Sequence, residues 1–428
     1  MEENSYFSLI IFNKAAATSV VFTLGCKVNA CESASLLTGL KELGYEVSDK
    51  LGFADLYILN TCAVTSEAEK KSRQAVARIR KINSAAKIIV TGCAAQNSPK
   101  SFLDKQGVYL VTGAINKDKI ISLINESGLH LDEGDCYYER FMPSKGERTR
   151  AYIKVQDGCE NFCAYCLIPY LRGACRSRDP KKVREEILHL GVKEAVITGI
   201  NLTAYNYEGL KLYDLIESLS DLDIRLRLGS LEENVVTDRF LSALSLLKDF
   251  APHFHLSLQS GSDKVLKEMN RKYCRDEFVE SINKIRKVFP DAAITTDIIV
   301  GFPTETEQDF SDTLSMCQAV NFADIHCFVF SPRKGTKAYD MPQLDAQTKN
   351  ERLQRLIKVK EESRKAFSEK FIGKTLSVLP EMVKDGYIEG YSSNYIRCYI
   401  KSTDFSEEII SVKATGLFKD GLLCEIQK

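Results

Sequence analysis

Residues 158–166 read GCENFCAYC and follow the short apolar run AYIKVQ at 151–156. Cys159, Cys163 and Cys166 are separated by three and then by two residues, so one loop can wrap three thiolates around one metal cluster. A 4Fe–4S cluster takes four ligands, and three cysteines would leave one iron open. The alternative is a zinc knuckle, but structural zinc needs four ligands. No fourth Cys or His follows at a fitting spacing, which favours the iron–sulfur site.

Downstream of this loop, short apolar runs alternate with helical patterns, as in an α/β fold. Six runs are too few for an eight-stranded barrel, so we expect a partial (β/α)6 barrel over residues 151–370, with its chemistry at the carboxyl ends of the strands. Strands are expected at AYIKVQ, EAVITGI, IRLRLGS, HFHLSLQ, AITTDIIVGF and ADIHCFVF, with helices at 180–190, 235–248, 263–288 and 305–320.

Upstream of the loop, three apolar runs each end at a cysteine. SVVFTLGC ends at Cys26, ADLYILNTC at Cys62 and KIIVTGC at Cys93. Such runs suit buried parallel strands, and residues just past parallel strands share one rim of the sheet. We therefore predict a Rossmann-like parallel-sheet domain over 18–130 whose three cysteines converge in a metal site. The alternative is that each cysteine packs as a small buried hydrophobe.

Two more segments complete the predicted organisation. Residues 131–150 are polar and turn-rich, as in a linker, and residues 345–370 are expected to form a charged helix of the central domain. From residue 371 the pattern changes to short alternating strands with glycine turns. Residues 371–428 should therefore form a small all-β barrel or sandwich, with strands at TLSVLPEMV, GYIEGYSS, YIRCYI, EEIISVKATG and LLCEIQ.

The composition excludes several classes of protein. The 428 residues carry 58 Lys and Arg against 58 Asp and Glu, so any nucleic-acid surface must be local. The N-terminus has acids at positions 2 and 3 and no basic region, unlike a signal peptide. No apolar run approaches the roughly 20 residues that span a bilayer. Fourteen cysteines in a chain of this kind favour the reducing cytoplasm and metal or redox chemistry.

The cysteine loop closely resembles that of radical S-adenosylmethionine (SAM) enzymes, and nearly the whole chain resembles one family of them, the methylthiotransferases. The final β segment is similar to a TRAM domain. Thr304, Ala174 and Cys175 depart from the usual pattern of the family, and none is an expected ligand. The resemblance is carried by TLGCKVNACES, NTCAVTSEAEKKSRQ, VTGCAAQ, YIKVQDGCENFCAYCLIPYLRG, RSRDP, ITGIN, RLRLGSLE, HLSLQSGSDKVLKEMNRKY and TTDIIVGFPTETEQDF.

This resemblance implies the cofactors and their ligands. SAM is implied as methyl donor and as radical source, with its amino and carboxylate groups on the open iron. An electron donor such as a flavodoxin or ferredoxin is the implied partner. Two 4Fe–4S clusters are implied, both catalytic, one held by Cys159, Cys163 and Cys166 and an auxiliary one held by Cys26, Cys62 and Cys93.

Within the family, GCKVN, KKSRQ and GYSSNYIRC most resemble the branch that methylthiolates C2 of N6-threonylcarbamoyladenosine beside the anticodon of tRNA. The isopentenyladenosine branch resembles GCQMN, and the ribosomal-protein branch GCPKN. The implied macromolecular partner is the tRNA anticodon stem–loop. Three alternatives stay open: the same chemistry on N6-isopentenyladenosine tRNA, the same chemistry on a ribosomal-protein aspartate, and a non-catalytic metal-stabilised RNA-binding protein.

Polar residues at strand ends are candidates for holding SAM, because such groups usually face the pocket of a barrel. A turn or capping role would explain each of them equally well. Arg225 and Arg227 should point to one side of their strand. Inward, they would pair with the SAM carboxylate or an RNA phosphate; outward, they would pack on helices. The expected SAM-binding residues are Thr198, Gly199, Asn201, Ser230, Glu232, Gln259 and Asp297.

Three places are candidates for RNA contact, through phosphates or by base stacking. They are the basic stretch 70–81, the helix 345–370, and the C-terminal domain with Tyr391, Tyr395 and Arg397. A charged helix is more often a solvated face, and residues 371–428 hold seven Lys and Arg against eight Asp and Glu. Cys31 is a rival ligand beside Cys26. The five histidines show no ligand spacing and are interpreted as structural: His130, His189, His253, His255 and His326.

Overall fold

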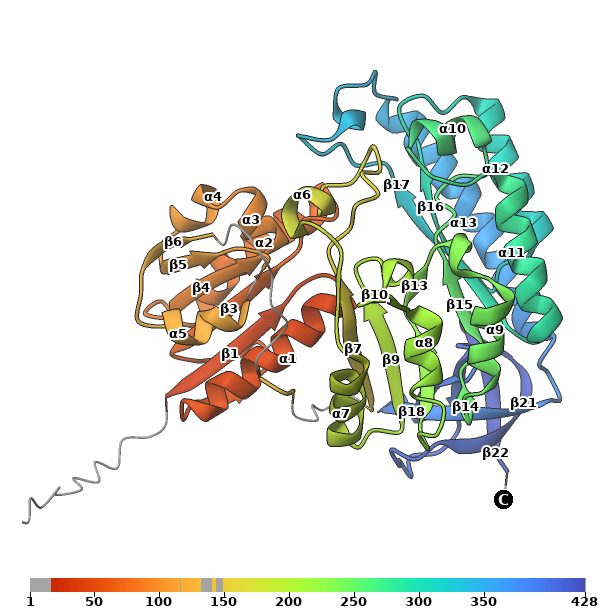
Figure 1. The fold of residues 1–428 in the computed structure, drawn as a ribbon, viewed down its shortest axis with the longest axis horizontal. Coiled ribbons are helices and arrows are strands. Elements are labelled where there is room, and N and C mark those ends of the chain that lie inside the picture. The colour runs from red at the N-terminus through yellow and green to blue at the C-terminus, as the bar shows by residue number, and fades with distance from the viewer. Residues whose placement is uncertain (1–16, 116, 132–140, 144–148, 428) are drawn as a thin grey trace, which may run out of the picture.

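The computed structural model describes residues 17–115, 117–131, 141–143 and 149–427. An N-terminal parallel sheet, a central partial barrel and a C-terminal β-barrel follow one another along the chain (Figure 1), which confirms the predicted fold class. Most of the predicted linker 131–150 lies outside the described residues, as does the chain before residue 17. Each helix in the described part of the chain is too short or too polar to span a bilayer.

The N-terminal domain is one sheet with the order β2-β1-β3-β4-β5-β6, in which all neighbouring strands are parallel. Its central strand β3 is buried on both faces: Tyr57 and Leu59 join one apolar cluster, and Leu56 and Ile58 join the other. The strands are β1 (Thr18–Thr23), β2 (Glu46–Ser48), β3 (Leu56–Thr61), β4 (Lys87–Gly92), β5 (Val108–Thr112) and β6 (Gly128–His130). The helices are α1 (Lys27–Glu42), α2 (Ser66–Ile82), α3 (Cys93–Asn97), α4 (Lys100–Leu103) and α5 (Ile120–Leu123).

The central domain continues the parallel pairing through the six predicted strands. The third run is interrupted at Gly229, so that β12 and β13 belong to two adjoining sheets. A Cβ on Gly229 would lie 2.9 Å from Oγ1 of Thr198 on the neighbouring strand, which explains the glycine at the bend. The six runs form β7 (Arg150–Asp157), β9 (Glu194–Gly199), β12 (Arg225–Leu228) with β13 (Ser230–Leu231), β15 (His253–Leu256), β16 (Ala293–Val300) and β17 (Asp324–Val329). The remaining strands are β8 (Arg176–Ser177), β10 (Asn206–Tyr207), β11 (Leu210–Lys211) and β14 (Asp249–Phe250).

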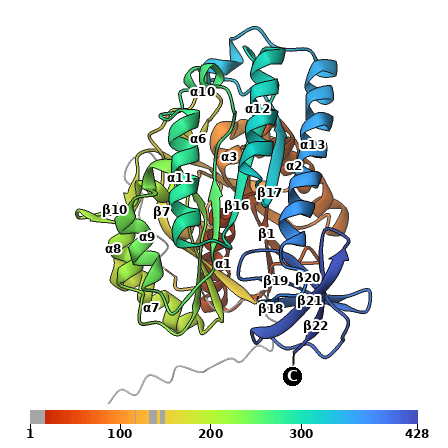
Figure 2. The same cartoon turned by 90° about the vertical axis from the view of Figure 1, so that its right-hand side faces the viewer.

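Helices cover the outer face of these strands, and α11, α12 and α13 stand side by side in Figure 2. Asp179 caps α7 by accepting a hydrogen bond from the N–H of Lys181, and Pro180 occupies the first turn, as a helix start favours. The helices of this domain are α6 (Ile168–Arg172), α7 (Pro180–Leu190), α8 (Leu212–Glu217), α9 (Asp238–Ser245), α10 (Asp263–Glu268), α11 (Arg275–Val288), α12 (Glu307–Val320) and α13 (Ala346–Glu369).

The expected continuous helix over 263–288 is wrong, because the chain breaks between α10 and α11. At the break, Asn270 has a φ of +61°, a left-handed conformation that asparagine tolerates better than most residues. Its side-chain amide donates to the carbonyl oxygens of Asn161 and Phe162 at 3.1 and 3.0 Å. The break therefore supports the loop that carries the three clustered cysteines.

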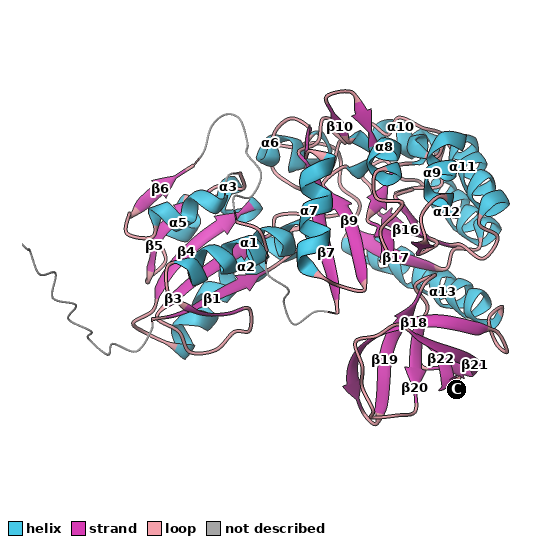
Figure 3. Ribbon diagram, turned by 60° about the horizontal axis from the view of Figure 1, so that its bottom comes forward, coloured by secondary structure: helices cyan, strands magenta, loops and turns pink. Residues whose placement is uncertain are grey.

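The C-terminal domain is a closed barrel with the order β18-β19-β20-β22-β21. It sits below the carboxyl end of α13 in Figure 3 and has its own apolar core, which includes Val378, Cys398 and Leu422. The barrel, one of two predicted options, consists of β18 (Thr375–Lys384), β19 (Tyr387–Ser392), β20 (Arg397–Ile400), β21 (Ile410–Phe418) and β22 (Gly421–Ile426).

Candidate functional site

One cavity of about 910 Å³ opens between the three domains. Its walls come from the strand ends of the N-terminal sheet, the interior of the partial barrel, the end of α13 and the loop between β19 and β20. A space of this size at the meeting point of domains is typical of a ligand or substrate site. The cavity is lined by all six of the cysteines predicted as metal ligands: Cys26, Cys62, Cys93, Cys159, Cys163 and Cys166.

Cys62 and Cys93 directly follow β3 and β4, and Cys26 lies just beyond the end of β1. The parallel sheet brings them together as the strand-end argument requires. Gly25 makes the approach possible, because its φ is +103° and an added Cβ would lie 2.7 Å from Cβ of Cys62. Burial, together with the nearby Cys93 and Cys26, raises the pKa of Cys62 to about 11.

The second three cysteines lie on the loop between β7 and α6. Gly158 has a φ of +73°, and a Cβ there would lie only 1.9 Å from the carbonyl oxygen of Ala174, so only glycine fits. Donors point at the sulfurs: the guanidinium of Arg271 lies 3.4 Å from Sγ of Cys163, and the N–H of Ile168 lies 3.4 Å from Sγ of Cys166.

Burial also raises the pKa of Cys166 to about 12, and Cys163, Cys159 and Cys93 add to this effect. Both cysteine groups line this one cavity. Thiols with such pKa values stay protonated at neutral pH unless a metal displaces the proton. Two sets of three thiolates with N–H donors at sulfur are the ligands that iron–sulfur clusters take, so the residues present fit these groups.

Other cysteines lie away from the cavity lining. The thiol of Cys31 is buried and donates to the carbonyl oxygen of Tyr152 at 3.2 Å, which removes the reason to treat it as a rival ligand. Cys175 lies closer to the site than its sequence position suggested. Its Sγ is 3.8 Å from the carbonyl oxygen of Gly158, and burial together with Cys159 raises its pKa to about 11.

The strand-end residues predicted to hold SAM all line the same cavity. Glu232 accepts hydrogen bonds from Asn161 at 2.8 Å and pairs with Arg271 at 3.0 Å, so it ties the cysteine loop to the third strand. Gln259 adopts a φ of +68° and is joined by a backbone bridge to β16. The structure therefore brings together Thr198, Gly199, Asn201, Ser230, Glu232, Gln259 and Asp297.

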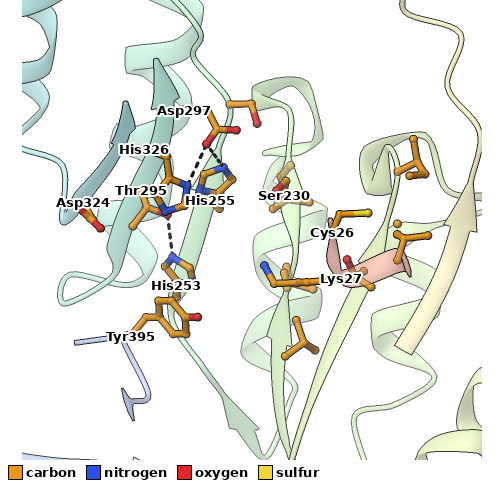
Figure 4. Close-up of a pocket in the computed structure, with 18 of the residues that line it drawn as sticks. Cys26, Lys27, Ser230, His253, His255, Thr295, Asp297, Asp324, His326 and Tyr395 are labelled. Atoms are coloured by element: carbon orange, nitrogen blue, oxygen red, sulfur yellow. Dashed lines mark hydrogen bonds and ion pairs between the residues drawn. The ribbon is translucent and has the colours of Figure 1, made fainter. Parts of the chain in front are cut away.

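Three of the five histidines interpreted as structural, His253, His255 and His326, line this cavity. Asp297 accepts from Nε2 of His255 at 3.3 Å and from Nδ1 of His326 at 3.0 Å (Figure 4). Thr295 bridges His255 and His253 through Oγ1, at 2.9 and 2.8 Å. The signal was available: residues two apart on one strand share a face, and His253 and His255 are two apart on β15.

Burial, with Arg227 and His255 nearby, holds the pKa of His253 well below its usual value, so its ring is neutral at physiological pH. That neutral ring stacks on Tyr395, with 4.6 Å between ring centroids, and Tyr395 stacks in turn on Tyr391 at 4.6 Å. A row of three rings thus joins the barrel interior to the C-terminal domain.

Arg227 lines the cavity, as the inward orientation predicts, but the partners of Arg227 and Arg225 are protein groups of neighbouring segments. Arg225 pairs with Asp249 at 3.1 Å and donates to Oγ of Ser377 at 2.6 Å. Arg227 pairs with Glu194 at 2.8 Å and donates to the carbonyl oxygens of Ser392 and Ser393. Both arginines therefore anchor the C-terminal barrel to the partial barrel.

Beneath the cysteines lies a buried ionic network that joins the two large domains. Arg172, with none of its side chain exposed, pairs with Glu32 at 2.8 Å and with Asp157 at 2.9 Å. Lys154 pairs with the same two acids at 3.2 Å, and Lys117 with Glu32. Burial opposes ionisation of Glu32, but Arg172 and Lys117 outweigh it and hold its pKa well below the usual range.

Of the three places considered for RNA contact, two reach the cavity. The end of α13 contributes Arg364, Phe367 and Ser368, and the C-terminal barrel contributes Tyr391, Tyr395, Arg397 and their neighbours. The basic stretch 70–81 forms most of α2, and no residue of it lines this cavity.

Comparisons with known proteins agree with this arrangement. Residues 153–317 match the radical SAM superfamily, and residues 18–113 match the uncharacterized protein family UPF0004. Threonylcarbamoyladenosine tRNA methylthiotransferase MtaB of Bacillus subtilis is 37% identical, over 93% of this chain and 93% of the relative. The protein of that name from Thermotoga maritima is 39% identical, over 94% and 95%.

A second group of relatives carries another name. The tRNA-2-methylthio-N(6)-dimethylallyladenosine synthase of Caldicellulosiruptor saccharolyticus is 32% identical, over 98% of this chain and 90% of the relative. Among solved structures, the radical S-adenosylmethionine methyltransferase TsrM from Kitasatospora setae superposes with a TM-score of 0.55 at 13% identity, over 76% of this chain and 74% of that one. That likeness concerns the fold alone.

Proposed function

Since the chain belongs to the radical SAM methylthiotransferase family, we propose that it adds a methylthio group to C2 of N6-threonylcarbamoyladenosine beside the anticodon of tRNA. The observation that carries this proposal is the convergence of two three-cysteine groups from different domains on one cavity. The 37–39% identity to relatives named for threonylcarbamoyladenosine favours that base over the isopentenyl form.

SAM and 4Fe–4S clusters are the cofactors of this enzyme, as of its relatives. We propose that Cys159, Cys163 and Cys166 hold the cluster that binds SAM, and that the three strand-end cysteines of the N-terminal sheet hold the auxiliary cluster. When bound, these groups supply a methyl group and the one-electron chemistry that an unactivated aromatic C–H bond requires, where a side-chain base alone is inadequate.

The protein itself then has to position the reacting groups and to shield them from solvent. Glu232, held by Arg271 and Asn161, fixes the cysteine loop against the wall predicted to contact SAM. The stacked rings of His253, Tyr395 and Tyr391 line the other end of the cavity as an aromatic wall. A base turned out of an RNA loop can pack against such a wall at a small unstacking cost.

The decisive experiment offers the reconstituted enzyme, under anaerobic conditions with SAM and a reductant, two anticodon stem–loops that differ only at the modified adenosine. One carries N6-threonylcarbamoyladenosine and the other N6-isopentenyladenosine. Mass spectrometry of the digested RNA should find the methylthio group on the first. Conversion of the isopentenyl form alone would contradict the choice of base, and conversion of neither RNA would contradict the proposed activity.

The relatives named for dimethylallyladenosine, at 32–35% identity, keep the isopentenyl base as the second candidate. We also propose a cytoplasmic location, because the substrate and the free thiols both suit it, and a flavodoxin or ferredoxin as electron donor. We further propose that the three domains span residues 18–130, 151–370 and 371–428.

A further inference from the structure

The acidic residues that line the cavity already have cationic or histidine partners. Glu232 pairs with Arg271 at 3.0 Å, and Asp324 with Lys360 at 3.4 Å. Asp420 pairs with Arg397 at 3.2 Å. Asp297 accepts from two histidines. The arginines Arg150, Arg172, Arg227, Arg271 and Arg397 are likewise paired with acids.

Two cations of the lining stand outside this balance. Within the described part of the chain, Lys27 and Arg364 have no carboxylate within the 4.0 Å of an ion pair, although both line the cavity. Arg364 is half-buried on α13, whereas Lys27 is exposed to the cavity space. Apart from the cysteines, the side chains of the lining therefore carry excess positive charge, which suits an anionic group on the substrate.

Of these two residues, Lys27 has the position that indicates a role. It is the first residue of α1 and follows Cys26 directly. In Figure 4 its side chain extends from beside Cys26 across the cavity toward the strand that carries His253. Its ammonium group therefore lies between the auxiliary cysteine site and the aromatic wall, and a base bound on that wall would present its substituent within reach.

We propose that Lys27 is the specificity-determining residue that binds the carboxylate of the threonyl group on the substrate adenosine. The inference rests on the proposed function. Because Lys27 and Cys26 are adjacent, their Cα atoms are about 3.8 Å apart, and one short segment would hold both the substituent and the sulfur site. An isopentenyl group would leave this ammonium without an anion, a mismatch that discriminates strongly.

The test is a binding cycle with two RNAs and four proteins. One RNA carries threonylcarbamoyladenosine, and the other carries the same group made from threoninol, which keeps the hydroxyl and lacks the carboxylate. The proteins are the reconstituted wild type, Lys27→Met, Lys27→Arg and the control Lys41→Met. Lys41 is exposed in the last turn of the same helix, about 21 Å away. Anaerobic fluorescence anisotropy gives each dissociation constant.

Wild type and Lys41→Met should bind the carboxylate RNA at least about tenfold tighter than the threoninol RNA. One charge-assisted hydrogen bond supplies a difference of this size. Lys27→Met should bind the two RNAs equally, and Lys27→Arg should keep most of the preference. Iron content and the visible spectrum establish that Lys27→Met retains both clusters. If it loses iron, Lys27→Arg decides: a preserved preference supports the inference and a lost one overturns it.

Other results separate the possible failures. If Lys27→Met lowers the affinity for both RNAs by the same factor, Lys27 contacts a phosphate and the inference is overturned. A fifth protein, Arg364→Met, should keep the preference, and its loss there would likewise overturn the inference. If Lys27→Met keeps the preference while the wild type forms the methylthio product, only the inference fails. If the wild type forms no product from the carboxylate RNA, the proposed function fails and takes the inference with it.

Discussion

Arg172 and Glu32 form a fully buried ion pair, with 2.8 Å between the guanidinium nitrogen and the carboxylate oxygen. Arg172 ends the helix that follows Cys166, and Glu32 lies in the second turn of the helix that follows Cys26. The pair therefore fixes the separation between the two cysteine groups, which belong to different domains. Under the proposed assignment of the two clusters, that separation determines where the substrate base meets both cofactors.

Replacing Arg172 by Leu should destabilise the protein by about 3–5 kcal/mol, because the change strands Glu32 and Asp157 in a buried site without their main partner. Denaturant unfolding under anaerobic conditions measures the loss. The matched control is Arg184→Leu, which removes an exposed pair with Asp221 and should leave the midpoint unchanged. Equal effects of the two changes would contradict a structural role for the buried network.

Changing Cys159, Cys163 and Cys166 together to Ala should abolish reductive cleavage of SAM, because those thiols are the proposed ligands of the SAM-binding cluster. Chromatography of the products after anaerobic reconstitution checks this. The matched control is Cys317→Ala, since Cys317 is a buried core residue of the same domain away from the cavity. Normal SAM cleavage by the triple variant would overturn the assignment of the loop.

The triple change of Cys26, Cys62 and Cys93 to Ala should behave differently. We expect a loss of about half the bound iron, because one of two clusters is removed, and a complete loss of methylthio transfer, while some SAM cleavage persists. Iron analysis and RNA mass spectrometry on the same sample distinguish these effects. Full retention of iron would mean that these thiols serve only to pack the strand ends.

Gly25→Ala should impair the auxiliary site without touching a ligand. The new Cβ would stand 2.7 Å from Cβ and 2.9 Å from Sγ of Cys62, at a φ of +103°. Gly44→Ala is the matched control: its φ is +85°, yet nothing lies within 4 Å of the added Cβ. Iron content should fall in the first variant and stay normal in the second. A similar loss in both would point to backbone strain instead of the collision.

Glu233 should make stability depend on pH. Burial, together with the neighbouring Glu232, raises its pKa to about 7, and its Oε2 is buried without a hydrogen-bond partner. Because the folded protein holds this proton more tightly than the unfolded chain does, the stabilising contribution is full below pH 4.5 and is lost as the pH rises through about 7.

Glu233→Gln should therefore raise the melting temperature at pH 8 by about 1–2 °C, once solvent screening is allowed for. The advantage should shrink as the pH falls toward 5.5, where the wild-type carboxyl is already protonated. Differential scanning fluorimetry of both holoproteins across this range measures it. A constant difference at every pH would show that the carboxyl does not titrate in this window.

The strand-end cysteines and the partial barrel were predictable because they follow from local periodicity: buried runs predict parallel strands, and parallel strands bring their ends together. The break at Asn270 was not, because it depends on a contact with residues more than 100 positions away. The roles of Arg225 and Arg227 could not be predicted for the same reason, since their acceptors lie in the C-terminal barrel. Lys27 was visible only as part of the motif GCKVN, and its side-chain direction required the fold.

The anchoring of the C-terminal barrel has a consequence for how such enzymes can be recombined. Its Tyr395 forms part of the cavity wall, and its Ser377, Ser392 and Ser393 satisfy arginines of the neighbouring domain. A barrel grafted from an unrelated protein would arrive without these acceptors and would leave two buried guanidinium groups poorly solvated. The barrel is therefore not an interchangeable module, and a working chimera must inherit Arg225 and Arg227 together with the strands that meet them.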